Sequence, residues 1–145
     1  MSDTSEFKEN SQAVQAHLSI MQSVIQRMAT NSSSSKAWCI TLVSAILVIV
    51  ADKGKPQYAW IAVVPAFLFF VLDAYYLALE KGFRNSYNSF IEKLHSERLA
   101  ASDLFVVVPK GGLFVLFFKS LGSFSVWPFY ATLLGMIYAA KAFVI

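Results

Sequence analysis

Charged residues are scarce in this chain. They make up 14% of its 145 residues, against about 25% in soluble globular domains, and 57% of the residues are hydrophobic. A single cysteine, Cys39, excludes an intramolecular disulfide and a cysteine zinc cage, and we expect it to be a packing residue. The first ten residues are polar and acidic, so we expect no cleavable signal peptide. This composition predicts a small integral membrane protein.

Patterns typical of catalysis and of nucleic-acid binding are lacking as well. The two histidines, His17 and His95, stand alone in the sequence, and Gly111-Gly112 has neither the spacing nor the lysine of a nucleotide-binding loop. The net charge is only +3, and the basic residues are spread along the chain instead of forming a patch. We therefore expect neither an enzyme nor a nucleic-acid-binding protein, and no cofactor or metal.

Two long apolar runs do stand out, at 37–51 and 58–79, and only the hexapeptide 52–57 separates them. A helix of about 20 apolar residues crosses the hydrocarbon core of a bilayer, so the region 36–80 predicts a transmembrane helical hairpin. The first run measures only about 22 Å as a helix, and it spans if Lys36 snorkels and the preceding serines continue the helix. Pro65 is expected to kink the second helix unless neighbouring groups satisfy the freed carbonyl.

A third apolar region fills 113–145 and would measure about 50 Å as one helix, too long for a single span. Lys119 and the segment 122–125 divide it, so we expect a third span at 126–144, started by Pro128 in its first turn. Before it, two β-rich runs flank Pro-Lys-Gly-Gly. That pattern favours a short β-hairpin at 104–118, with an interfacial or re-entrant segment as the alternative.

Two further segments have one apolar face at helical spacing. Residues 13–29 predict an amphipathic helix, which we expect to pack on the protein's own cytoplasmic part and not on the lipid surface. Asn31 and the four serines after it are interpreted as a break or as capping residues. The second segment continues the apolar run beyond residue 79, and its apolar residues have heptad-like spacing. The apolar faces of the two segments can therefore cover each other, and subunits can also pair through the second one. These residues form the candidate oligomer seam: Phe83, Tyr87, Phe90 and Leu94.

Basic residues near the span ends predict the orientation. Two, Lys53 and Lys55, lie in the loop of the hairpin. Six lie near its other end: Arg27, Lys36, Lys81, Arg84, Lys93 and Arg98. By the positive-inside rule, the N-terminus and residues 80–111 are then cytoplasmic, and three spans place the C-terminus outside. The expected organisation has four parts: a cytoplasmic tail and amphipathic helix at 1–35, the transmembrane hairpin at 36–80, a cytoplasmic helix and interfacial segment at 81–124, and a third transmembrane helix at 125–145.

Asp73 is the most informative polar residue, because an acidic group within an apolar helix needs a partner or water. Folding the hairpin about 52–57 sets Lys36 level with Asp73. The two therefore either form an interhelix pair, with the carboxylate in interfacial water as a variant, or line a polar path through an oligomer. Thr41 and Ser44 share one helix face, where their hydroxyls either bond helix carbonyls or line a pore.

A row of small residues on the third apolar segment would let helix backbones approach closely. The row serves packing within the protomer or contact between subunits, and its members are Ala131, Gly135 and Ala139.

The chain also contains short motifs of a known family. They are Arg-Met-Ala-Thr-Asn-Ser over 27–32, Lys-Ala-Trp over 36–38, and Leu-Asp-Ala-Tyr-Tyr over 72–76, which passes into Glu-Lys-Gly-Phe-Arg over 80–84. With the amphipathic helix and the tight hairpin, the region 13–100 resembles the small bacterial membrane proteins grouped as SLATT-type effectors. The resemblance implies two spans with a cytoplasmic helical extension, found beside nucleotide-signalling and antiphage defence genes. It also implies an oligomer that perturbs the inner membrane when a partner signals infection.

Two functions follow as hypotheses. The first is an oligomeric effector of the bacterial inner membrane that perturbs the bilayer or forms a pore, triggered by a soluble signalling or sensor protein encoded nearby. The second is a non-conducting membrane anchor or regulator that recruits a soluble cytoplasmic partner. A transporter would predict inverted repeats with paired broken helices, and the sequence contains no such repeat.

Overall fold

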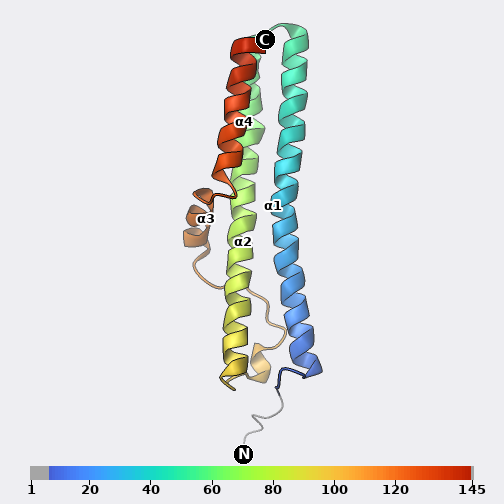
Figure 1. Ribbon diagram of the computed structural model, residues 1–145, viewed down its shortest axis with the longest axis vertical. Coiled ribbons are helices and arrows are strands. Elements are labelled where there is room, and N and C mark those ends of the chain that lie inside the picture. Colours follow the sequence, from blue (N-terminus) through green and yellow to red (C-terminus); the bar gives the residue numbers. More distant parts are fainter. Residues whose placement is uncertain (1–6, 145) are drawn as a thin grey trace, which may run out of the picture.

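The computed structural model describes residues 7–144, and all regular elements in that range are helical. Two long antiparallel helices form a rod (Figure 1). The first is α1, Gln12–Lys53, and the second is α2, Val63–His95, preceded by the 3₁₀ helix η1, Pro56–Ala62. Gly54 ends α1 in the left-handed conformation, with φ of 60°, and its N–H bonds the carbonyls of the last turn.

Both long helices are apolar enough to cross a membrane and much longer than a membrane requires. The 42 residues of α1 measure about 63 Å, roughly twice the hydrocarbon thickness. η1 and α2 together form a second apolar stretch of 40 residues, Pro56–His95. In each of the two long helices, the half next to the 52–57 turn is apolar, and we call it the apolar half. The half at the other end of the rod, where α1 begins and α2 ends, is the polar half.

The break expected at Asn31 and the following serines is wrong, because α1 continues through them. Serine interrupts a helix when its side chain competes for backbone groups. Here Ser35 Oγ instead donates to the carbonyl of Asn31, one turn earlier, at 2.9 Å, and Ser32 bonds a residue of α2. The kink at Pro65 stays a prediction. Pro65 is the third residue of α2, where its missing N–H removes no hydrogen bond from the helix interior.

The polar halves of α1 and α2 pack against each other. Val14 and Met21 of α1 are buried together with Phe90 and Leu94 of α2. This arrangement confirms that the amphipathic segment 13–29 packs on the protein's own chain.

The C-terminal third differs from the β-hairpin expected at 104–118. After the short 3₁₀ helix η2, Ala101–Asp103, the chain runs without regular structure to residue 112 and then forms α3, Leu113–Leu121. Within α3, Leu116, Phe117 and Ser120 are the more buried residues, which is the spacing of a helix face. Packing against α2 thus overrides the β propensity of this segment.

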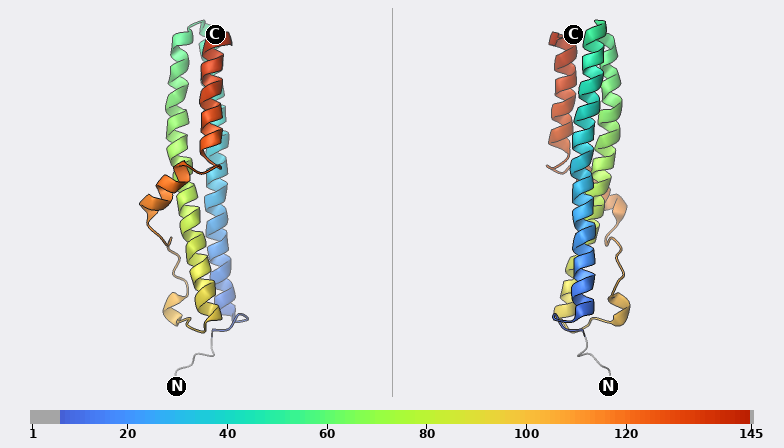
Figure 2. Two further views of the ribbon diagram at one scale, coloured as in Figure 1. Left: turned by 60° about the vertical axis from the view of Figure 1, so that its left-hand side comes forward. Right: turned by 90° about the vertical axis from the view of Figure 1, so that its right-hand side faces the viewer.

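The last helix, α4, spans Trp127–Ala139 and continues as a π-helix, η3, over Ala140–Val144. It begins with Pro128 in its first turn, as predicted, and lies beside the apolar halves of α1 and α2 (Figure 2). It packs through one face, whose buried residues are Val126, Tyr130, Leu133 and Ile137.

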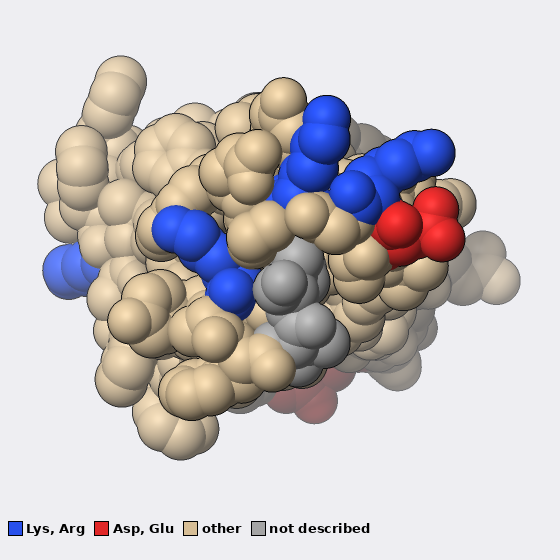
Figure 3. All heavy atoms as spheres, turned by 90° about the horizontal axis from the view of Figure 1, so that it is seen from above, with Lys and Arg blue, Asp and Glu red and all other residues tan. Residues whose placement is uncertain are grey.

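The end of α4 returns to the 52–57 turn. The ammonium of Lys141 lies 4.7 Å from the centre of the Trp60 ring, and that of Lys55 lies 5.9 Å from the Tyr58 ring. Seen along the rod, this end displays several basic side chains (Figure 3). The end of α4 and the hairpin turn therefore lie together, at the opposite end of the rod from the start of α1.

Candidate functional site

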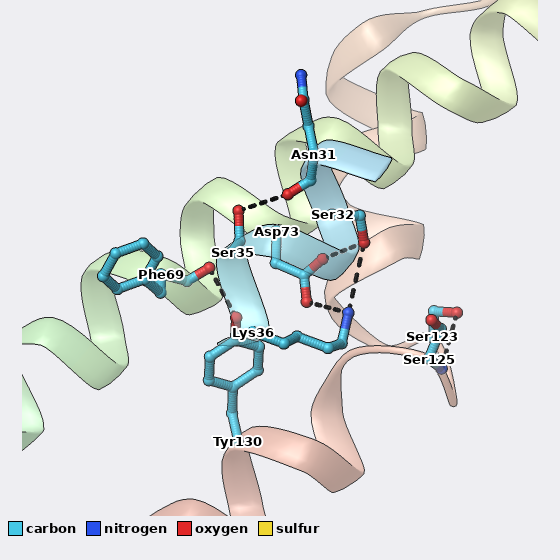
Figure 4. Close-up of polar contacts among 9 residues, drawn as sticks. All are labelled: Asn31, Ser32, Ser35, Lys36, Phe69, Asp73, Ser123, Ser125 and Tyr130. Carbon is cyan, nitrogen blue, oxygen red and sulfur yellow. Dashed lines mark hydrogen bonds and ion pairs between the residues drawn. The ribbon is translucent and has the colours of Figure 1, made fainter. Parts of the chain in front are cut away.

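A buried ion pair joins α1 and α2 near the middle of the rod (Figure 4). The ammonium of Lys36 lies 2.5 Å from Asp73 Oδ2, and Ser32 Oγ donates a hydrogen bond to Asp73 Oδ1. Asp73 is fully buried, whereas 21% of the Lys36 side chain is exposed. The interhelix pair expected from the hairpin register is confirmed. We refer to Ser32, Lys36 and Asp73 as the polar node.

The polar node lies at the boundary between the polar half and the apolar half of the rod. The apolar run of α1 starts directly after Lys36, and α4 begins beside the node. Tyr130 of α4 donates its hydroxyl to the carbonyl of Phe69 at 3.0 Å, one helical turn from Asp73. Among the described residues, Asp73 Oδ2 has no polar partner besides Lys36, so the Lys36 ammonium is the only positive charge that compensates the buried carboxylate there.

The other two polar candidates of the first span lie away from the polar node. Thr41 and Ser44 are both exposed on the outer face of α1, whereas Cys39 and Val43 face the core. Thr41 Oγ1 donates to the carbonyl of Ala37 at 2.9 Å, the ordinary arrangement for a helix threonine. The four candidate residues therefore fall into two groups, a buried pair and an outward pair, and do not form one path inside the protomer.

The candidate oligomer seam is largely used within the chain. Phe90 and Leu94 are buried against α1, and Gln22 donates to the Tyr87 hydroxyl at 3.3 Å. Phe83, at the upper end of the seam, is half-buried. Pairing of subunits through this seam stays a prediction.

The small-residue row of α4 faces outward. Ala131, Gly135 and Ala139 are all exposed, and a Cβ added to Gly135 would meet nothing within 4 Å. The helix packs on its own protomer through the opposite face, so packing within the protomer is not the use of this row. Contact between subunits stays a prediction.

A segment that the sequence patterns do not reveal crosses the polar half. Residues 97–112, here called the strap, run from the end of α2 back along the rod to α3 (Figure 2). The N–H of Phe105 donates to Nδ1 of His17 at 2.9 Å, and the buried His17 ring lies 4.2 Å from that of Phe90. Phe105 has φ of 61°, a left-handed conformation that costs a residue with a side chain about 1 kcal/mol. Burial lowers the pKa of His17, and the nearby Asp103 carboxylate opposes that shift.

Further polar contacts hold the strap on α2. Lys93 pairs with Asp103 at 2.6 Å, and this hydrogen bond, helped by that from the Ala100 N–H, lowers the pKa of Asp103. The N–H of Lys110 donates to the carbonyl of Gly82 at 2.9 Å. Beneath the strap lies a cavity of about 310 Å³, whose lining includes His17, Lys93 and Lys110. The strap is thus attached to both long helices, and it leads directly into α3.

The described residues include no group of three histidine, cysteine, aspartate or glutamate side chains that could hold a metal ion. The fold defines the class: an all-helical protein with two helices long and apolar enough to span a membrane. Comparison with protein-family models, with curated proteins and with solved structures found no match.

Proposed function

We propose that this chain is an integral protein of the bacterial inner membrane with three spans, formed by the apolar halves of α1 and α2 and by α4 with η3. The side chains that face away from the bundle support this. Val48, Phe67 and Met136 are each 60% or more exposed although they are apolar, whereas the outer face of α1 in the polar half carries glutamine, serine and arginine. An apolar outer surface is costly in water and suited to lipid.

Charge supports a cytoplasmic N-terminus. Of the twelve lysines and arginines, Lys53, Lys55 and Lys141 belong to the hairpin turn and the end of α4. The other nine lie before α1, in α1 up to Lys36, in α2 beyond Asp73, in the strap or in α3. The positive-inside rule then places the polar half, with the strap, in the cytoplasm, and the end of α4 outside.

Within that membrane the chain acts as an oligomeric effector that perturbs the bilayer or forms a pore, as part of antiphage defence. The observation that carries this proposal is the outward position of Thr41 and Ser44 in an otherwise apolar half. Hydroxyls on the outer face of α1 can line a polar path only between protomers, so conduction requires an assembly. The trigger is a soluble signalling or sensor protein that acts on the polar half. Since α1 is unbroken from His17 to Thr41, a movement there reaches the apolar half directly.

The test is inducible expression in a bacterial host, with a membrane-potential dye and a viability count, in cells that carry the neighbouring genes and are challenged with phage. Wild type should depolarise the cells, and Thr41→Val/Ser44→Ala should not at equal membrane abundance. Thr132→Val is the matched control, because Thr132 is also an exposed threonine that donates to a carbonyl one turn earlier, at 2.8 Å, on α4. Polarised, viable wild-type cells would contradict the effector function.

A second function, a non-conducting anchor that recruits a soluble cytoplasmic partner, is favoured by the strap. Phe105, Val106 and Val108 are each more than half exposed, although they lie in the polar half. A soluble partner could cover them. This function predicts that Val106→Ser/Val108→Ser abolishes crosslinking to that partner and leaves the membrane potential of wild-type and variant cells equal.

A further inference from the structure

The outer face of α3 is apolar and points away from the bundle. Phe114 is 82% exposed, Phe118 66% and Val115 57%, and the three lie on the side opposite to the inward-facing Leu116 and Ser120. A patch of this kind on a soluble surface marks an interaction site. The question is which surface covers it.

The position of α3 along the rod indicates the answer. α3 lies obliquely beside the middle of α2 (Figure 2), and Leu116 Cδ1 lies 3.6 Å from the position that a Cβ on Gly82 would occupy. Gly82 follows the end of the apolar run of α2 at residue 79 by less than one helical turn. α3 is therefore level with the edge of the proposed membrane layer, where headgroups begin.

The charge of this region matches an anionic surface. No aspartate or glutamate occurs from residue 104 to 145, whereas Lys110 precedes α3 and Lys119 lies on its exposed side. A lysine close to a membrane that contains anionic lipid contributes about 1 kcal/mol of attraction. A second copy of the same face would instead bring Lys119 toward its own counterpart. A nine-residue helix also offers fewer residues than the roughly 20–30 that each partner contributes to a standard protein interface.

We propose that α3 lies obliquely in the headgroup region of the cytoplasmic leaflet and binds anionic phospholipid. Phe114 and Phe118 enter the boundary with the acyl chains, and Lys119 contacts the lipid phosphates, whereas the Lys110 ammonium donates to Ser89 Oγ at 2.8 Å. Interfacial helices bury their apolar face about 5–10 Å into that boundary. The inference rests on the proposed membrane insertion and adds an interfacial contact to the three spans.

The test uses the full chain reconstituted into vesicles whose acyl chains carry bromine, which quenches nearby tryptophan. Trp38, Trp60 and Trp127 are replaced by phenylalanine, and one tryptophan is introduced by Phe118→Trp. A variant that keeps only Trp60 reports insertion of the spans. Ile20→Trp, a half-exposed position in the polar half, is the aqueous control. One set of vesicles is phosphatidylcholine alone, and the other also contains phosphatidylglycerol.

We expect bromine near the headgroups to quench the Phe118→Trp reporter, more strongly with phosphatidylglycerol, and to leave the Ile20→Trp reporter unquenched. Lys119→Gln should remove the dependence on phosphatidylglycerol. An unquenched Phe118→Trp reporter beside a quenched Trp60 overturns the α3 contact and leaves the spans in place. Equal quenching in both vesicles overturns the preference for anionic lipid. If Trp60 itself is unquenched, the proposed membrane insertion fails.

Discussion

Pro109 of the strap lies against Gly82 of α2 so closely that only glycine fits at that position. A Cβ on Gly82 would lie 2.7 Å from Pro109 Cβ, inside van der Waals contact. The next residue, Lys110, donates its N–H to the Gly82 carbonyl at 2.9 Å. The strap therefore crosses α2 at the only glycine of that helix.

Gly82→Val should displace the strap from α2, because the added side chain meets Pro109. We expect the Lys110 amide to exchange its hydrogen at least tenfold faster, measured by hydrogen–deuterium exchange of the full chain in detergent. Gly135→Ala is the control, since nothing lies near its Cβ, and alanine stabilises a helix by about 0.5–1 kcal/mol relative to glycine. Unchanged exchange at Lys110 in Gly82→Val would show that the strap does not depend on this crossing.

Lys36→Met should destabilise the protein more than Asp73→Leu. Removing one partner of a buried pair costs about 3–5 kcal/mol. The cost falls fully on Lys36→Met, which leaves a buried carboxylate, whereas the partly exposed Lys36 can turn toward water when Asp73 is lost. The double variant Lys36→Met/Asp73→Leu should be close to wild type. The measurement is the free energy of unfolding in detergent. Removing the exposed Glu80–Arg84 pair should cost only about 0.3–0.5 kcal/mol.

Acid should loosen the strap through His17. The neutral ring accepts the hydrogen bond from Phe105, and burial lowers the pKa of His17 below its ordinary value of 6.5. This contribution to stability is complete above pH 6.5 and is lost as the pH falls from 6.5 toward the lower pKa of the folded state. Asp103, whose pKa is also lowered, adds a second loss only below its ordinary value of 3.8.

The rate at which a protease cleaves the strap measures this loosening. Cleavage of wild type should accelerate below pH 6.5 relative to His17→Asn, in which an amide oxygen accepts the same bond without titrating. His95→Gln removes the other, exposed histidine and should leave the acceleration unchanged. The same profile in wild type and His17→Asn would exclude His17 as the cause.

Labelling of single cysteines should place the end of α4 with the hairpin turn. In a Cys39→Ala background, an impermeant thiol reagent should label Lys55→Cys and Phe143→Cys on intact spheroplasts. It should reach Glu92→Cys only after lysis. The reason is that Lys141 contacts Trp60 at the turn, so the proposed three spans put both sites on one side of the bilayer. Labelling of Phe143→Cys only after lysis would contradict the third span.

The polar node was predictable because a short turn permits few registers for a helical hairpin. Once 52–57 is fixed as the turn, Lys36 and Asp73 are the charged residues at the same level, and charge in an apolar layer must pair. The start of α4 was predictable for a similarly local reason, the position of Pro128. In both cases a single residue carries a strong physical constraint.

The strap and the helical state of 113–118 could not be predicted in this way. The bond between Phe105 and His17 joins residues 88 positions apart, and its donor is a backbone N–H, which every residue except proline has. Four of the six residues at 113–118 are phenylalanine or valine, which favour strands, whereas the packing of this segment on α2 favours a helix. The outward direction of Gly135 likewise depends on which face α4 turns to the bundle.

Because α4 lies beside the apolar half of the rod only, the two halves have different thicknesses. Three helices pack together in the apolar half, whereas the polar half is a two-helix pair covered by an irregular segment. Regions with fewer buried contacts open at lower free energy. The rod should therefore melt in two steps, with the polar half separating first while the three-helix half stays intact. A partner that binds the separated form would need to supply only the energy of that first step.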